Sequence, residues 1–401
     1  MKKMTLLLAL CLGCTFTFAQ EAAKEKKDSV GFVFTTVKAN KITSVKNQAS
    51  SGTCWSFSGI GFLESELMRM GKPEYDLSEM FIVHHNYQEK AQKYVRMHGK
   101  INFAAGGSFA DVFDAIKEYG IVPDTAMRGL NYGEEKHRHG ELDAVTEAYV
   151  DAIIKNPNKQ HLSTAWFEGF KGILDAYLGA IPENFNYNGK QYTPKTFAAS
   201  LGLNMDDYVS ITSFTHHPFY AKFAVEIEDN WRWEESYNLP LDEMMSIIDN
   251  AINNGYTVAW GADVSEKGFT RQGIGVVPDV DPNKAPAGTD EAKWIGLSPK
   301  EKEDLVYKVT GPVKEKVITQ ELRQKGFDNY ETTDDHGMQI FGIAKDQKGN
   351  KYYMIKNSWG TENKYKGIWY ISEAYVKYKT IDFSVHKDTV PKDIRKKLGI
   401  K

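Results

Sequence analysis

Cysteine is scarce in this chain. Only three of its 401 residues are cysteine, and two of them, Cys11 and Cys14, lie within the first twenty. If that segment is removed from the mature protein, Cys54 remains alone and a disulfide within one chain is excluded. A lone cysteine is a buried apolar residue, a thiol that pairs between chains, or a reactive nucleophile. The count by itself favours the first of these.

The chain also lacks an excess of charge of either sign. It has 50 Lys and Arg against 53 Asp and Glu, for a net charge of −3. Proteins that bind nucleic acid through its phosphates usually carry a basic face. The one basic run is "PKDIRKKLGIK" at the C-terminus, which we interpret as a solvated terminal helix. No nucleic-acid partner is indicated.

Long apolar runs are missing after the N-terminus. The run from Met4 to Ala19 follows two lysines and ends in small residues, which is the layout of a secretory signal peptide. It is shorter than the about 20 residues that a membrane helix needs. We expect cleavage after Ala19 and an exported protein, periplasmic or secreted, with no stable membrane anchor. Lipidation at Cys14 is the less favoured alternative, because Cys11 stands where an aliphatic residue is wanted.

Helical periodicity fills the first half of the chain and alternating strands fill the last part, so the sequence predicts an α+β fold. We divide it into six segments. They are a signal peptide (1–19), a flexible N-terminal segment (20–40), a helical half (41–128), a helical insertion (129–235), a β half (236–376) and a basic C-terminal tail (377–401).

Cys54 stands at the start of a predicted helix that Gly71 and Pro73 end. Apolar residues three and four apart form one face of this helix: Phe57, Ile60, Leu63, Leu67 and Met70. Cys54 is in the first turn and off that face, which weakens the buried interpretation. Because the N-terminus of a helix favours negative charge, the position suits a thiolate.

Further elements follow from capping residues and alternation. We expect helices after the cap Ser78, at 109–120, 141–154, 165–180 and 241–254, a buried strand at 256–264, and a hairpin of 336–346 with 351–359 followed by a third strand at 367–372.

A reactive thiol needs a base, and the chain has ten histidines. His336 lies in "TTDDHGMQIFG" at the entrance to a predicted strand, where a rigid scaffold can aim it. Three pairs could instead be metal ligands but lack cysteine or carboxylate at the usual spacing; we interpret them as surface histidines: His84 with His85, His137 with His139, and His216 with His217. No metal or organic cofactor is expected.

The segment "NQASSGTCWSF" resembles the active-site segment of papain-like cysteine peptidases. "DDHGMQIFGI" is similar to that family's aspartate–histidine strand, and "YYMIKNSWG" with "GIWYIS" resembles its asparagine segment. The resemblance implies a papain-like fold, with a helical left part and an antiparallel β right part, here carrying a large helical insertion.

The resemblance also implies roles for six residues. Cys54 would be the nucleophile, His336 its acid–base partner, Asn357 the residue that orients the imidazole, and Gln48 a donor to the oxyanion. Gly106 and Gly107 would let the substrate backbone approach, although a turn before a helix explains the same glycines. For Trp55 and Trp359, core packing is as good an account as catalysis.

The spacing between Cys54 and His336 narrows the resemblance to one branch of the family. His336 follows Cys54 by 282 residues, against about 130–150 in papains and cathepsins. The insertion resembles the bleomycin hydrolase and aminopeptidase C branch. This implies a cysteine peptidase that removes N-terminal residues from peptides through a Cys54 thioester, and a hexamer.

Two features leave alternatives open. Only 44 residues follow Asn357, so the C-terminal arm that meets the substrate's amino group in that branch is expected to be shortened. An open cleft would make the protein a papain-like endopeptidase. A non-catalytic binding protein and an acyltransferase are disfavoured, since Cys54, His336 and Gln48 are all present and the third residue is Asn357 rather than aspartate.

Overall fold

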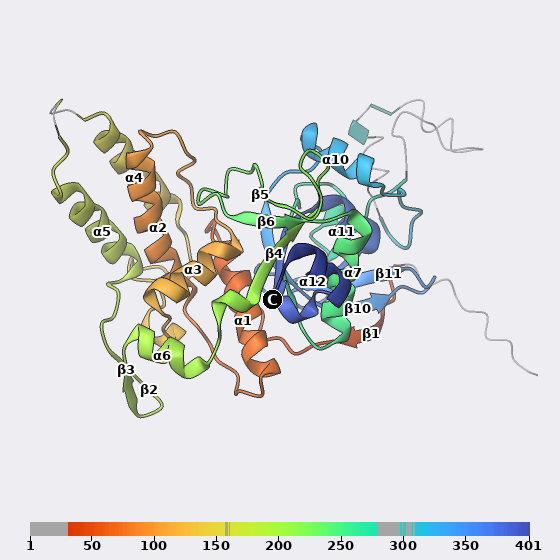
Figure 1. The fold of residues 1–401 in the computed structure, drawn as a ribbon, viewed down its shortest axis with the longest axis horizontal. Helices are drawn as coiled ribbons and strands as arrows, with labels where there is room; N and C mark the ends of the chain where they lie inside the picture. Colours follow the sequence, from red (N-terminus) through yellow and green to blue (C-terminus); the bar gives the residue numbers. More distant parts are fainter. Residues whose placement is uncertain are drawn as a thin grey trace, which may run out of the picture.

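The computed structural model describes residues 31–156, 159, 161–279, 297–298, 300–301, 307 and 309–401. The predicted signal peptide, with Cys11 and Cys14, lies outside these residues. The described chain forms two halves, one of helices and one built on a twisted sheet with its own helices (Figure 1). Within the described residues, no helix combines the length and apolar character needed to cross a bilayer.

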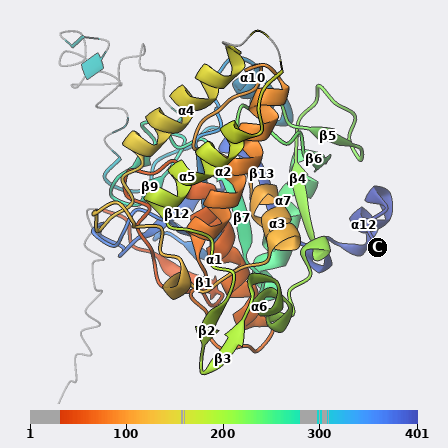
Figure 2. The same cartoon turned by 90° about the vertical axis from the view of Figure 1, so that its left-hand side faces the viewer.

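The helical half packs around one apolar core. Its helices are α1 (Cys54–Arg69), α2 (Glu79–Arg96), α3 (Phe109–Tyr119), α4 (Gly140–Ile154), α5 (Ala165–Leu178) and α6 (Pro194–Leu201). Helix α1 lies between the other helices and the sheet in Figure 1, and Figure 2 views the molecule from the helical side, with α4 and α5 toward the viewer. It is therefore buried on nearly every side, including its acidic residues Glu64 and Glu66.

The described strands of the second half pair in the order β5-β6-β4-β13-β7-β10-β11-β12-β9-β8, and β1 pairs with β10. Their bounds are β1 (Thr35–Ala39), β4 (Tyr208–Thr212), β5 (Lys222–Ala224), β6 (Glu235–Asn238), β7 (Val258–Ala262), β8 (Phe269–Thr270), β9 (Ile274–Gly275), β10 (His336–Lys345), β11 (Lys351–Lys356), β12 (Ile368–Ser372) and β13 (Thr380–His386). A separate hairpin joins β2 (Phe185–Tyr187) to β3 (Lys190–Tyr192).

In the described part of the chain, four helices accompany the sheet: α7 (Leu241–Asn253), α10 (Gln320–Asp328), α11 (Glu373–Lys379) and α12 (Lys392–Leu398). Helix α12 ends the chain beside α7, where Lys397 Nζ lies 2.7 Å from Glu243 Oε1. Its apolar residues Ile394 and Leu398 are buried. The basic run "PKDIRKKLGIK" is thus a helix as predicted, but one with a buried face.

The locally coded elements form as predicted. The Ser78 hydroxyl accepts a hydrogen bond from the N–H of Phe81 at 3.0 Å and caps α2. A capping box between Ser108 and Asp111 begins α3, and Gly120 follows its end. The antiparallel hairpin of β10 and β11 and the third strand β12 are also present.

Three predicted segments differ in character from the structure. Residues 35–39 of the "flexible" segment 20–40 form β1, and 380–386 of the "tail" 377–401 form β13, a strand in the middle of the sheet. The "helical" insertion 129–235 contributes β4 and β5 to the same sheet. Strand β1 pairs with β10, and β4 and β7 pair with β13, all far away in sequence, which local patterns do not reveal. Met70 is 42% exposed rather than on the buried face of α1. The boundaries of the six segments stay predictions.

Candidate active site

Cys54 is the first residue of α1 and the one free cysteine of the described residues. The start of β10 lies against this helix end: a side chain on Gly337 would come within 2.8 Å of Ser58 Oγ and 3.3 Å of Trp55 Cα. Hydrogen bonds from the backbones of Gly337 and Trp55 reach the Cys54 sulfur. The close fit of α1 and β10 therefore brings the thiol beside the residue that follows His336.

His336 and Asn357 form a buried pair. His336 Nε2 lies 2.7 Å from Asn357 Oδ1, which also accepts a hydrogen bond from the N–H of Ser358. The Trp359 ring stacks on the His336 ring, with centroids 4.6 Å apart. Asn357 directly follows β11, and Trp359 is two residues further on. Residues after the end of β11 therefore orient the His336 side chain at the beginning of β10. The Nδ1 atom of His336 stays available for the thiol.

Burial opposes an isolated charge on either member of the thiol–imidazole pair. It raises the pKa of the Cys54 thiol to about 12, a shift to which Asp229 and Asp334 add. It lowers the pKa of His336 to about 4, against the hydrogen bond to Asn357 and the charge of Asp335, which both raise it. Transfer of the proton from sulfur to imidazole would create two opposite charges that favour each other. Ionisation of both groups together is therefore less unfavourable than ionisation of either one alone.

Gln48 is held in place by two hydrogen bonds of its side chain. Its Oε1 accepts from Ser358 Oγ at 2.6 Å, and its Nε2 donates to the carbonyl of Ser51 at 2.7 Å. One hydrogen of the Nε2 group is left for a further acceptor. Gln48 is buried. A preorganised N–H donor of this kind, beside the backbone N–H of Cys54, can stabilise an oxyanion.

Gly106 and Gly107 lie over Trp55. The Trp55 indole donates to the carbonyl of Ala105 at 3.0 Å, and a side chain on Gly107 would meet its ring at 2.9 Å. The ammonium group of Lys90 donates to the carbonyls of Ala104 and Gly106. The two glycines are thus next to the residue that follows Cys54. Their predicted role in substrate binding remains a prediction.

Sequence reasoning did not single out two carboxylates near this site. A side chain on Gly106 would lie 2.1 Å from each carboxylate oxygen of Asp229, 123 residues later in the chain. Asp229 and Asp334 both raise the pKa of Cys54 by their negative charge. Only the "DDHG" motif hinted at Asp334, and nothing in the sequence placed Asp229 here.

The histidine pairs are less uniformly exposed than predicted. His84 and His139 are buried, because both lie in the packed helical half; His84 Nε2 is 2.9 Å from Asp175 Oδ1. His216 and His217 each hydrogen-bond Glu226 through Nε2 at 2.9 Å, a grouping that resembles a metal site.

The hydrogen bonds of His216 argue against metal binding there. Gln324 Nε2 lies 3.0 Å from His216 Nδ1, and its partner atom Oε1 already accepts from the N–H of Thr215. Nδ1 must then be the acceptor, so the ring proton of neutral His216 is on Nε2 and leaves no lone pair there for a metal.

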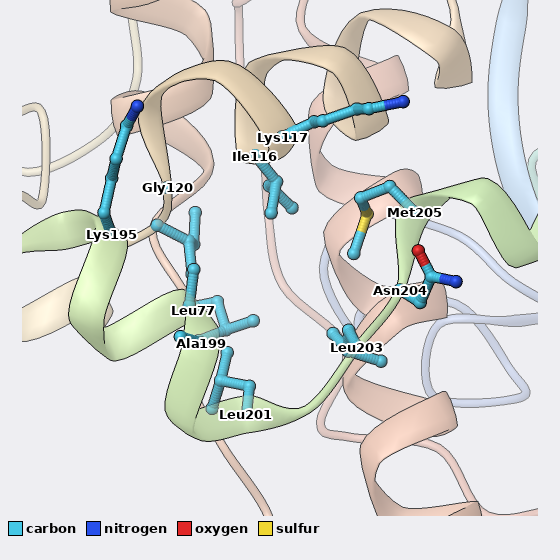
Figure 3. A pocket seen from close by; sticks show the side chains of 12 residues that line it. Leu77, Ile116, Lys117, Gly120, Lys195, Ala199, Leu201, Leu203, Asn204 and Met205 are labelled. Carbon is cyan, nitrogen blue, oxygen red and sulfur yellow. The ribbon is translucent and has the colours of Figure 1, made fainter.

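A cavity of about 280 Å³ lies elsewhere, between α3 and α6 (Figure 3). Aliphatic side chains such as Ile116, Leu201 and Leu203 line most of it, while Lys117 and Lys195 extend away from its centre. It contains none of the six predicted site residues and no nucleophile with a base. The candidate catalytic residues therefore lie apart from this cavity.

Comparison with known proteins agrees with this geometry. Residues 33–168 match the family described as papain family cysteine protease, and residues 177–281 with 315–400 match the peptidase C1-like family. Together these matches span most of the chain.

Several curated proteins are similar over nearly the same range. Aminopeptidase C of Lactobacillus delbrueckii subsp. lactis is 24% identical, covering 88% of this chain and 81% of that protein. Bleomycin hydrolase of Gallus gallus is 22% identical over 87% of this chain and 81% of its own. The crystal structure of PepW from a Lactobacillus has the same fold, with a TM-score of 0.67 at 19% identity over 91% of this chain and 84% of that one.

Proposed function

This chain belongs to the peptidase C1 family of papain-like cysteine peptidases, on its aminopeptidase C and bleomycin hydrolase branch, and we propose that it removes N-terminal residues from peptides through a thioester on Cys54. The observation that carries the proposal is the pairing of His336 Nε2 with Asn357 Oδ1 at 2.7 Å beside the helix that begins with Cys54. This is the arrangement that a thiol nucleophile, an acid–base group and an orienting residue require.

In the first half of the reaction, His336 takes the proton of the Cys54 thiol and the sulfur attacks the carbonyl carbon of the scissile bond. The carbonyl oxygen becomes negative and receives hydrogen bonds from the Gln48 amide and the Cys54 backbone N–H. His336 then gives its proton to the leaving nitrogen. The C–N bond breaks, the shortened peptide leaves with a free amine, and the N-terminal residue stays on Cys54 as a thioester.

In the second half, His336 takes a proton from water, and the resulting hydroxide attacks the thioester carbonyl. The C–S bond breaks and the sulfur recovers its proton from His336. Asn357 keeps the imidazole in place through both halves, because its Oδ1 accepts the Nε2 hydrogen and leaves Nδ1 facing the reaction.

The proposal is tested with two fluorogenic peptide amides that differ only by acetylation of the N-terminus. Purified protein is assayed under reducing conditions, because exposed reactive thiols oxidise, with Cys54→Ala as the inactive control. Cleavage of the free amine alone supports an aminopeptidase. Equal cleavage of both supports the alternative, an endopeptidase with an open cleft. Full activity of Cys54→Ala would remove Cys54 from the mechanism.

Export after cleavage at Ala19 and assembly into a hexamer are further parts of the proposal. The layout of residues 1–19 supports the first, and resemblance to the aminopeptidase C branch supports the second. N-terminal sequencing of protein recovered from cell fractions tests export, and light scattering of the purified protein tests the hexamer. Peptides are the expected partners in either case.

A further inference from the structure

An acidic cavity adjoins the catalytic residues. It measures about 480 Å³ and is lined by the segment from Glu226 to Asp229 on one side and by Phe327 to Asp334 on the other. Five of its lining residues are acidic and none is basic: Glu226, Glu228, Asp229, Asp328 and Asp334. The charged side chains that line this cavity are all negative, which favours a cation; Lys90, which is not among the lining residues, also acts on Asp229.

Asp229 and Asp334 both line this cavity. Neither carboxylate makes a hydrogen bond or a salt bridge to another described residue, although the charge of the buried Lys90 acts on Asp229. Both residues keep partial contact with solvent, although the carboxyl group of Asp334 lies deep in the protein. A carboxylate removed from water without a partner is unfavourable. The two groups are therefore placed to receive a positive charge.

The surrounding segments hold Asp229 in place. Asn230 Nδ2 donates to the carbonyls of Val225 and Glu234, and Arg232 binds Asp111 of α3 at 2.6 Å. With these neighbours fixed, both Asp229 oxygens lie 2.1 Å from the position that a Gly106 side chain would occupy. Anything that approaches this face of Gly106 meets the Asp229 carboxylate, so the path of substrate along the two glycines is obstructed at Gly106.

Asp334 is held in the same way. The Thr333 hydroxyl donates to Asp335 at 2.8 Å, and Asp335 in turn accepts from the N–H groups of Val264 and Ser265. The residue after Asp335 is His336, which is fixed by its hydrogen bond to Asn357. Asp334 therefore has a rigid position two residues from the catalytic imidazole.

Both carboxylates act on the reacting sulfur, because their negative charges raise the pKa of Cys54. The amino group of an N-terminal residue is two bonds from the carbonyl carbon that Cys54 attacks. A group that binds this amine must lie close to the sulfur. Asp229 lies against Gly106, and Asp334 lines the same cavity two residues before His336.

We propose that Asp229 and Asp334 together bind the free α-ammonium group of the substrate's N-terminal residue and so restrict cleavage to the first peptide bond. This inference rests on the proposed function and names the residues that select its substrate. Asp229 also blocks a second residue from occupying Gly106, so one residue is removed at a time. The bound ammonium cancels the charges that hinder ionisation of Cys54, which couples thiolate formation to a correct substrate.

The test compares Asp229→Asn and Asp334→Asn with the parent on an alanyl fluorogenic amide and its N-acetyl counterpart. Loss of one partner of a desolvated charge pair should lower the preference for the free amine by about 30-fold or more in each variant, mainly through KM. Glu228→Gln is the matched control, since Glu228 is exposed, lines the same cavity and loses the same charge. Its preference should change by less than about threefold. Alkylation of Cys54 by iodoacetamide shows that each variant keeps a folded nucleophile.

Three results would overturn the inference. The first is a free-amine preference that both variants retain. The second is that the parent prefers acetyl-Lys-Ala amide over acetyl-norleucine-Ala amide and that the variants lose this preference. The carboxylates would then bind a basic side chain of the substrate and not its α-ammonium group. The third is release of whole dipeptides from a free-amine substrate. If instead the parent cleaves acetylated and free substrates equally, the aminopeptidase proposal itself fails.

Discussion

Two groups of buried charges lie along α1, and they are arranged in opposite ways. Beneath the middle of the helix, Lys46 Nζ lies 2.7 Å from Glu79 Oε1, and Thr43 joins Glu64 to Lys356 through hydrogen bonds of 2.6 and 2.8 Å. Near the N-terminus of the same helix, Asp229 and Asp334 make no hydrogen bond or salt bridge with another described residue, and the charge of Lys90 acts on Asp229 without direct contact. The first arrangement balances its charge within the protein, whereas the second leaves its charge for a ligand. The comparison separates charges that hold the two halves together from charges that select a substrate.

The largest loss of stability is expected in the first group, where the buried charges are balanced within the protein. Lys46→Met leaves Glu64 and Glu79 without their nearest cation, and breaking a buried pair costs about 3–5 kcal/mol. Burial already raises the pKa of Glu79 to about 7, and Lys46 opposes that rise. The loss of stability in urea unfolding should therefore be greater at pH 8 than at pH 5. Lys117→Met, which breaks an exposed pair with Asp206, is the control and should hardly move the midpoint.

Gln48→Ala sharpens the comparison at the proposed catalytic residues. Loss of one oxyanion donor typically lowers kcat by roughly 10²–10³-fold. We expect this fall with little change in KM or in the urea midpoint. If KM rises by as much as kcat falls, Gln48 acts in ground-state binding and not on the oxyanion.

Asn357→Ala should have a somewhat smaller effect. The variant loses the hydrogen bond that orients His336, while the stacked Trp359 still covers the ring. Misplacement of a catalytic group by an ångström costs about 10²-fold in rate. Steady-state kinetics measure this, and Asn357→Gln, which keeps an amide oxygen at a different reach, should recover little activity. Parent-like rates in both variants would show that Trp359 alone fixes the imidazole.

The smallest expected effect is a gain in stability and not a loss. Burial raises the pKa of Asp229 to about 6. The folded state thus binds more protons than the unfolded one between about pH 4 and 6, so this group makes stability fall as pH rises through that range. Asp229→Asn removes the penalty and should stabilise the free protein by about 1 kcal/mol at pH 8 but not at pH 4. Destabilisation at pH 8 in urea would mean that Asp229 has a structural partner after all.

The helices and strands that are encoded by neighbouring residues could be predicted. Helix α2 follows from the Ser78 cap, and the hairpin of β10 and β11 from alternation around a turn, since each depends on residues close together in the chain. The candidate catalytic residues were predicted in another way. Cys54 stood out because it is single and begins a helix, but His336 and Asn357 were identified through a resemblance and not through any spacing rule.

The remaining features depend on contacts between distant segments. Strand β13 pairs with β7 and β4, more than a hundred residues earlier, so the basic composition of 377–401 suggested a tail where the structure has a central strand. The burial of His84 has the same origin, because α5 covers it with Asp175.

The sequence by itself indicated a candidate nucleophile, the helix that begins with it and the family to which the chain belongs, because capping, periodicity and short motifs can be read along the chain. Only the tertiary structure decided where Asp229 lies. Its carboxylate reaches Gly106 because Arg232 and Asn230 fix a segment of the insertion against α3. A side chain 123 residues from the glycine that it covers has no local signal, since its position follows from packing that the whole fold creates.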